Sequence, residues 1–300
     1  MYTQAKLILM LLAIFAASSS TAQSSNTESD DEELKMAALE ALMAAPSDRA
    51  LPIVIRVIEG NGSDEMKESA LFILSQIDHP DASAYLTRLA QSGTGELRLD
   101  TIRMIGINGG DALNELSAIY ASGDSDVREA VIEAYMIAGD AKGLYDIAIS
   151  ANNNEDFEEA VQMLGAMGAH DELKMIRDSV GVSDAIIEAY IISGDADALR
   201  ELALDGSDLE QQANAIEALG IVGADDAEAL LMQAYRDSDS ELIKEAALDG
   251  LLIGDFDDGV LQLYRSSTST SEKRELLERL VIMDSDQVMD IIDETLAGDR

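Results

Sequence analysis

Few residues in this sequence could perform chemistry. His79 and His170 are the two histidines, they lie far apart in the chain, and cysteine is absent. Disulfides, thiolate metal sites and cysteine nucleophiles are therefore excluded, and no arrangement of serine, histidine and aspartate predicts a catalytic triad. Carboxylates are so abundant that choosing two as an acid–base pair carries no information. The sequence predicts no catalytic residue, no metal site and no cofactor.

Two aspartate-rich segments, residues 237–239 and 255–259, could offer oxygen ligands to calcium. Neither has the spacing of a calcium-binding helix–loop–helix, which requires a glutamate at the twelfth position of the loop. Aspartate is also a preferred residue at the start of a helix. We expect helix capping at both segments, with calcium binding as the alternative.

Short apolar segments, which we call anchors, recur about every 30 residues. Each anchor spans four residues, and the anchors begin at Leu39, Leu71, Ile102, Ile132, Val161, Ile187, Ile216, Leu248 and Leu277. A period of this length is typical of a solenoid, in which each unit covers the apolar face of its neighbour. Apolar residues at helical spacing around each anchor predict one amphipathic helix per unit.

Residues 125–150 show the organisation of one unit most clearly. Apolar residues from Val127 to Tyr135 predict the first helix of a pair. Gly139 can take the left-handed conformation that ends this helix, and Asp140 can cap a second, shorter helix. A serine followed three residues later by glutamate has the spacing of a capping box, which occurs at Ser207, Ser238 and Ser269.

Residues 124–140 (DSDVREAVIEAYMIAGD) resemble a short HEAT-like repeat, the variety also seen in phycobilisome lyase proteins. The resemblance covers residues 34–300 and implies an all-α, right-handed α-solenoid of about nine HEAT-like helix-pair repeats. The basic residue of that motif falls on Lys35, Lys67, Arg98, Arg128, Lys244 and Lys273, and is replaced by Phe157, Ser183 and Gln212. We expect each of these basic residues to pair with an aspartate in an adjacent turn.

One face of the predicted first helices carries a row of acidic residues. The second residue of an anchor and the residue four positions earlier share this face. We call the following set the acidic row: Glu129, Glu133, Glu158, Gln162, Asp184, Glu188, Glu217, Glu245 and Asp249. The HEAT-like resemblance implies that these helices line a concave side, where the acidic row would bind a partner. The alternative is an ordinary solvated helix face.

The chain is strongly acidic, with 59 Asp and Glu against 20 Lys and Arg and a net charge of −39. This charge repels nucleic acid and anionic membranes, and it favours a protein or peptide partner, including a basic one. Adaptation to saline surroundings would explain the same composition. The two explanations are compatible.

The N-terminal residues have the pattern of a secretory signal peptide. Lys6 precedes an apolar run at residues 7–17, and the small residues Ser20 and Ala22 follow. The run is shorter than the roughly 20 residues that span a bilayer. We therefore expect residues 1–22 to be removed after Ala22, with export to a bacterial periplasm or beyond. An uncleaved anchor is the alternative.

Residues 23–33 contain no apolar residue and predict a disordered acidic leader before the solenoid of residues 34–300. These features together favour an exported, non-enzymatic scaffold that binds a protein or peptide and does not insert into the membrane after cleavage. The resemblance leaves a lyase-like enzyme or enzyme subunit as an alternative. An accessory factor in envelope stress signalling is a third possibility.

Overall fold

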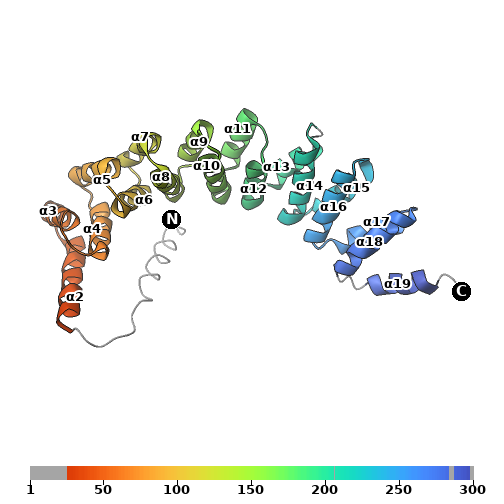
Figure 1. Cartoon of the computed structure of the whole chain (residues 1–300), viewed down its shortest axis with the longest axis horizontal. Coiled ribbons are helices and arrows are strands. Elements are labelled where there is room, and N and C mark those ends of the chain that lie inside the picture. The colour runs from red at the N-terminus through yellow and green to blue at the C-terminus, as the bar shows by residue number, and fades with distance from the viewer. Residues whose placement is uncertain (1–25, 206, 284–286, 298–300) are drawn as a thin grey trace. The chain divides into compact units, whose positions relative to one another are not determined.

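The structure, a computed structural model, describes residues 26–205, 207–283 and 287–297. These residues form the α-helices α2 to α19 and two short 3-10 helices, and they contain no β-strand (Figure 1). They fall into two compact units, unit 1 (Met1–Ala82) and unit 2 (Ser83–Arg300). Successive helices form pairs within each unit, which confirms the predicted all-α solenoid.

Unit 1 begins with a helix that starts before the predicted solenoid, at Asn26, and ends within the first anchor, at Glu40. It contains α2 (Asn26–Glu40), η1 (Ala41–Ala44), α3 (Ser47–Ile58) and α4 (Asp64–Gln76), and α5 (Pro80–Ser92) crosses its end. The backbone of residues 26–33 is helical, so the expectation of a disordered leader at 23–33 is wrong for these residues. Acidic sequence near a helix N-terminus favours the helix through its dipole. The predicted signal peptide, residues 1–22, lies outside the described residues.

Unit 2 contains most of α5 and seven helix pairs that follow it. The first helices are α6 (Glu96–Asn108), α8 (Ser125–Ala138), α10 (Asn154–Met167), α12 (Asp184–Ser193), α14 (Leu209–Val222), α16 (Glu241–Ile253) and α18 (Thr270–Ile282). The second helices are α7 (Leu116–Ser122, after η2 at Asp111–Glu115), α9 (Ala141–Ser150), α11 (His170–Val180), α13 (Ala196–Leu204), α15 (Ala227–Asp237), α17 (Asp257–Ser266) and α19 (Val288–Ala297). In unit 2 the first helices lie along the inner side of a curve and the second helices along its outer side (Figure 1).

Glycine and aspartate separate the two helices of a pair, as the sequence predicts. Gly139 has φ 71° and ends α8 in the left-handed conformation, which glycine adopts without steric cost. The Asp140 carboxylate then accepts a hydrogen bond from the backbone N–H of Gly143 at 3.0 Å, at the start of α9. Gly194 and Asp195 repeat both features between α12 and α13.

Of the three serines with capping-box spacing, one caps a helix, and its glutamate, Glu272, accepts from the Ser267 hydroxyl and not from the backbone N–H of Ser269. Ser269 accepts a hydrogen bond from the backbone N–H of Glu272 and caps α18. Asp208 caps α14 in place of Ser207, and Ser238 follows the end of α15 instead of starting α16. The serine–glutamate spacing therefore does not distinguish a cap from a neighbouring turn residue.

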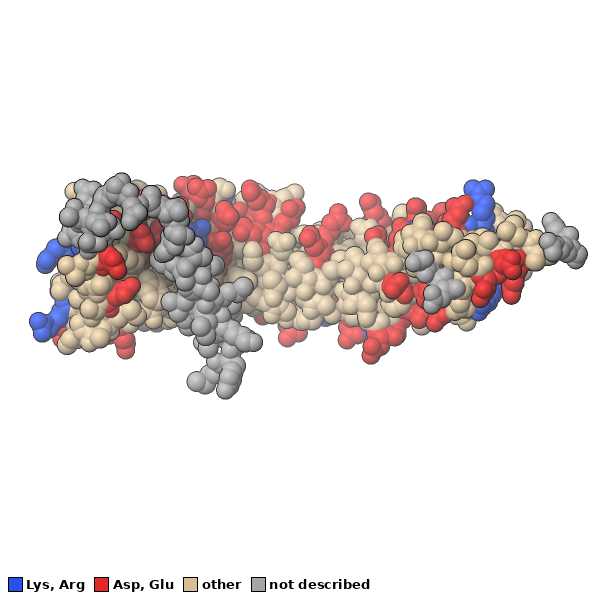
Figure 2. All heavy atoms as spheres, turned by 90° about the horizontal axis from the view of Figure 1, so that it is seen from below, with Lys and Arg blue, Asp and Glu red and all other residues tan. Residues whose placement is uncertain are grey.

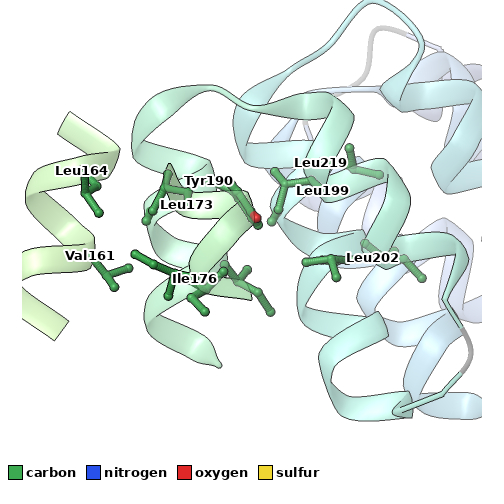
Figure 3. Close-up of a cluster of buried hydrophobic side chains, with 14 of the residues drawn as sticks. Val161, Leu164, Leu173, Ile176, Tyr190, Leu199, Leu202 and Leu219 are labelled. Carbon is green, nitrogen blue, oxygen red and sulfur yellow. The ribbon is translucent and has the colours of Figure 1, made fainter. Parts of the chain in front are cut away.

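The anchors form the core. Every anchor contributes buried first and last residues, except that Leu42 and Leu277 are half-buried. In unit 2 one continuous hydrophobic cluster runs from Ala90 to Ile291, and Figure 3 shows side chains from successive pairs interleaving within it. Each fully buried leucine or isoleucine stabilises the fold by about 1.5–3 kcal/mol.

At the basic position of the repeat, the side chains of Arg98 and Gln212 contact the end of the preceding second helix and not an aspartate. Arg98 Nε donates to the backbone carbonyl of Ala90 at 2.8 Å, and Gln212 Nε2 donates to that of Ala203 at the same distance. These carbonyls belong to the last turn of the preceding second helix, where they lack a partner within the helix. The predicted aspartate pairing occurs at Arg128, whereas Lys244 and Lys273 lie over the rings of Tyr235 and Tyr264.

The first helices of unit 2 approach one another very closely at alternate interfaces. A methyl group added at Gly106, Gly165 or Gly220 would lie 2.4, 2.8 or 2.1 Å from the backbone carbonyl oxygen of Ala134, Ala189 or Gly250, respectively. These three glycines directly follow the anchors of α6, α10 and α14. In α8, α12 and α16 the residue after the anchor is Met136, Ile191 and Leu252. The sequence alternates a small and a large residue, and the array is therefore built from repeats taken two at a time.

We predict that Gly220→Ala destabilises the protein by about 1–3 kcal/mol, because the new methyl group would overlap the backbone of Gly250. The sign of this stability change is informative, because a glycine-to-alanine change at an uncrowded helical position stabilises a protein by up to about 1 kcal/mol. Urea denaturation followed by circular dichroism measures the effect. Gly259→Ala in α17 is the control, because its methyl group would meet the ends of the Glu228 and Leu251 side chains and no backbone atom. A more stable Gly220→Ala protein would contradict the close approach.

Candidate functional site

The first helices α8, α10 and α12 enclose an acidic hollow of about 690 Å³. Five members of the acidic row line it: Glu129, Glu158, Gln162, Asp184 and Glu188. Ser125, Glu155, Asp156, Glu159, Met163 and Ala185 complete the lining. This lining contains seven carboxylates and no lysine, arginine or histidine. Figure 2 shows Asp and Glu side chains gathered over this part of unit 2.

The remaining members of the acidic row lie outside the hollow, and arginines neutralise two of them. Arg103 Nε of α6 donates to Glu133 at 2.6 Å, and Arg279 of α18 pairs with Asp249. Glu217 and Glu245 do not line the hollow. Arginine from a neighbouring first helix therefore neutralises carboxylates of α8 and α16. The negative charge of the hollow itself is less compensated. Within the described part of the chain, Glu129, Glu158 and Glu188 make no ion pair.

Asp156 forms a wall of the hollow and is almost fully buried. Its carboxylate accepts hydrogen bonds from the Tyr120 hydroxyl at 2.6 Å and from Arg128 Nε at 2.8 Å. The Asp156 backbone N–H donates to the Asn153 side chain at 2.8 Å, which caps α10. Burial, followed by the hydrogen bond to Asp156, raises the pKa of the Tyr120 hydroxyl. This network joins α7, α8 and α10 and holds one side of the hollow in place.

Sequence reasoning missed three acidic residues of the hollow, Glu155, Asp156 and Glu159, and the pKa of Glu159 is perturbed. Its pKa is raised from 4.5 to about 7, first by burial and then by the negative charges of Glu129, Glu133, Asp156 and Glu155. The acidic row follows only the exposed face of each helix, whereas Glu159 is half-buried beside it. A signal was present in the sequence, because the equivalent positions of α8 and α12 are the alanines Ala130 and Ala185.

The other candidate residues make contacts that fit structural roles. His170 Nδ1 lies 2.7 Å from an Asp195 carboxylate oxygen, and Asp195 also caps α13. His79 lies 3.5 Å from Asp48 and 3.8 Å from Asp81. Among the residues that the structure describes, no group of three histidine, aspartate or glutamate side chains could hold a metal ion.

The expectation that the aspartate-rich segments cap helices is wrong, because the N-cap residues of α16 and α17 are Ser240 and Phe256, and neither side chain makes a capping hydrogen bond. Asp255 has φ 57°, so the left-handed residue after α16 is this aspartate and not Gly254. Ser238 accepts a hydrogen bond from the backbone N–H of Ser240 at 3.1 Å. No helix within the described ranges is both long enough and apolar enough to cross a membrane.

The fold and the hollow define a helical-repeat protein of the α-solenoid type with an acidic inner face. No protein-family model matches the chain, and no curated protein matches it. Among solved structures it is similar to the complex of CpcE and CpcF of phycocyanin lyase from Nostoc sp. PCC7120. The identity is 17%, over 77% of this chain and 93% of that chain, with a TM-score of 0.33. Nothing about the function of this chain follows from so distant a likeness.

We predict that Glu159 makes the stability of the protein depend on pH. Because its folded-state pKa is raised, its contribution to stability is fully present below about pH 4.5 and is lost as the pH rises through about 7. Glu159→Gln removes this titration, so the variant should be more stable than the parent at pH 8. The measurement is the urea midpoint between pH 5 and pH 8. Glu158→Gln is the control, and parallel profiles for parent and Glu159→Gln would contradict the prediction.

Proposed function

We propose that this chain is an exported, non-enzymatic scaffold that binds a cationic peptide or protein segment in the acidic hollow. The observation that carries the proposal is the set of seven carboxylates around one hollow with no basic residue in its lining. Burial first, and then repulsion from neighbouring carboxylates, raises the pKa of Glu159 to about 7. Cationic side chains entering the hollow would relieve this repulsion, which favours binding.

The arginines of unit 2 support the same proposal. Arg103 and Arg279 neutralise Glu133 and Asp249, and Arg128 neutralises the buried Asp156. The exposed carboxylates of α10 and α12 have no such partner within the described residues. A negative surface of this kind increases the rate at which cationic partners associate, and the effect weakens as salt screens the charges.

We predict that neutralising Glu129, Glu158 and Glu188 together, each to glutamine, lowers the affinity for a basic peptide about tenfold or more at low salt. The probe is a fluorescent peptide of alternating lysine and glutamine, and fluorescence anisotropy measures its binding. Because none of the three side chains is buried, helicity should be unchanged.

The matched control removes the same charge elsewhere. Asp171→Asn, Asp225→Asn and Asp258→Asn lie outside the first helices and are exposed. This triple variant should bind the basic peptide as the parent does. Equal losses in the two triple variants would show that net charge, and not the hollow, binds the peptide.

The export part of the proposal is supported by the apolar run at residues 7–17 and the small residues before Gln23. We predict that the chain, expressed in a Gram-negative host, is recovered from the periplasm with Gln23 as its first residue. Intact-mass spectrometry of each cell fraction measures this. Leu11→Arg, which interrupts the apolar run, should keep the full-length chain in the cytoplasm. A full-length chain in the membrane fraction would instead support the uncleaved anchor.

A further inference from the structure

A row of isoleucines runs beside the acidic row on the first helices of unit 2. The position is the second residue after each anchor. It is occupied by Ile107, Ile137, Ile192, Ile221, Ile253 and Ile282, with Ala166 in α10, and we call this set the isoleucine row. Its members in α12, α14 and α16 are 42%, 48% and 48% exposed. Single exposed apolar residues are common on protein surfaces. An exposed isoleucine that recurs at the same position of successive repeats is unusual.

The isoleucine row and the acidic row share one helix face. In α12 the residues Asp184, Glu188 and Ile192 follow one another at intervals of four, and residues four apart are neighbours on a helix surface. The last two lie about 6 Å apart along the helix axis, because each residue rises 1.5 Å. The inner surface of unit 2 therefore has two parallel tracks, one acidic and one apolar. In Figure 2, surface that is not acidic runs beside the gathered carboxylates.

The fold itself does not require isoleucine at these positions. The anchors already supply the buried residues of each first helix, as at Ile216 and Leu219 of α14. A β-branched residue on an exposed helix turn lowers helix propensity. An apolar side chain that stays exposed to water also contributes no hydrophobic stabilisation to the fold. Exposed isoleucines at one position of the successive helices α12, α14 and α16, beside a charged row, are typical of an interaction surface.

We infer that the inner face of unit 2 binds a basic amphipathic helix of another protein. The inference rests on the proposed function and adds the chemistry of the partner. Lysines and arginines on one side of the helix face the acidic row, and apolar side chains on its other side contact the isoleucine row. A helix about 10–12 Å in diameter covers both tracks. A second copy of this chain is a poor occupant, because each copy carries a net charge of −39.

The spacing of the repeats sets the pattern of the partner. Packed helices lie about 8–10 Å apart, a distance that a bound helix covers in about five to seven residues. One apolar side chain per two turns of the partner would therefore meet successive members of the isoleucine row. The row extends from α6 to α18, so longer amphipathic helices contact more isoleucines.

The experiment compares defined peptides on the unaltered protein. One peptide contains lysine and leucine arranged as an amphipathic helix, the second is a scrambled sequence of the same composition, and the third replaces leucine with glutamine at equal charge. We expect the amphipathic peptide to bind about tenfold or more tightly than either of the others, and its circular dichroism to become helical on binding.

Variants of the protein then locate the contact. Ile192→Ser, Ile221→Ser and Ile253→Ser together should reduce affinity for the amphipathic peptide about tenfold or more, and should leave binding of the lysine–glutamine peptide unchanged. The control variant carries Ile149→Ser, Met175→Ser and Leu204→Ser, which are exposed residues of the second helices, and should bind both peptides as the parent does.

The outcomes separate this inference from the proposed function. If the lysine–glutamine and amphipathic peptides bind equally tightly, or the bound amphipathic peptide is not helical, the inference is wrong and the cationic scaffold stands. If no basic peptide binds, the proposed function fails as well. The peptide comparison needs no variant, so it decides the matter even if the isoleucine variant does not fold.

Discussion

The structure of unit 2 depends on the burial of each anchor against the next helix pair. A single pair of helices has too little apolar surface to form a core of its own. Tyr190 is fully buried, and Figure 3 shows it between side chains of neighbouring helices. This constraint fixes one side of every first helix. The opposite side is left free to carry the acidic row and the isoleucine row, because no neighbouring pair has to contact it.

Around the acidic hollow, the packing that buries apolar side chains also brings negative charges close together, where they repel one another. Helix stacking brings α8, α10 and α12 together, and with them the carboxylates that line the hollow. Asp156 is held by an arginine and a tyrosine. Glu159 is half-buried and faces further negative charge, so its pKa is raised and it binds its proton more tightly. The stacking of the core thus maintains a concentration of negative charge that the same side chains would not reach in a flexible chain.

The sequence predicts most of the fold, because the two features that determine it, the anchors and the residues at helix ends, are local in the sequence. Anchor spacing identifies the first helices, and Gly139 with Asp140 marks a helix boundary that the structure confirms. The hollow is predicted only in part. Glu159 was missed because its burial depends on how three helices converge. The acceptor for Arg98 was missed because it is a backbone carbonyl, which no residue type reveals.

The alternation of glycine and larger residues along the first helices has a mechanical consequence. At Gly106, Gly165 and Gly220 the helix backbones touch, so these interfaces resist sliding and rotation. The hollow extends across the interface between α8 and α10, where Met136 takes the place of glycine and the packing is less intimate. Flexing of unit 2 would concentrate at such joints. The width of the hollow would then change as unit 2 bends. A molecule bound in the hollow would restrict this bending and fix the curvature of unit 2.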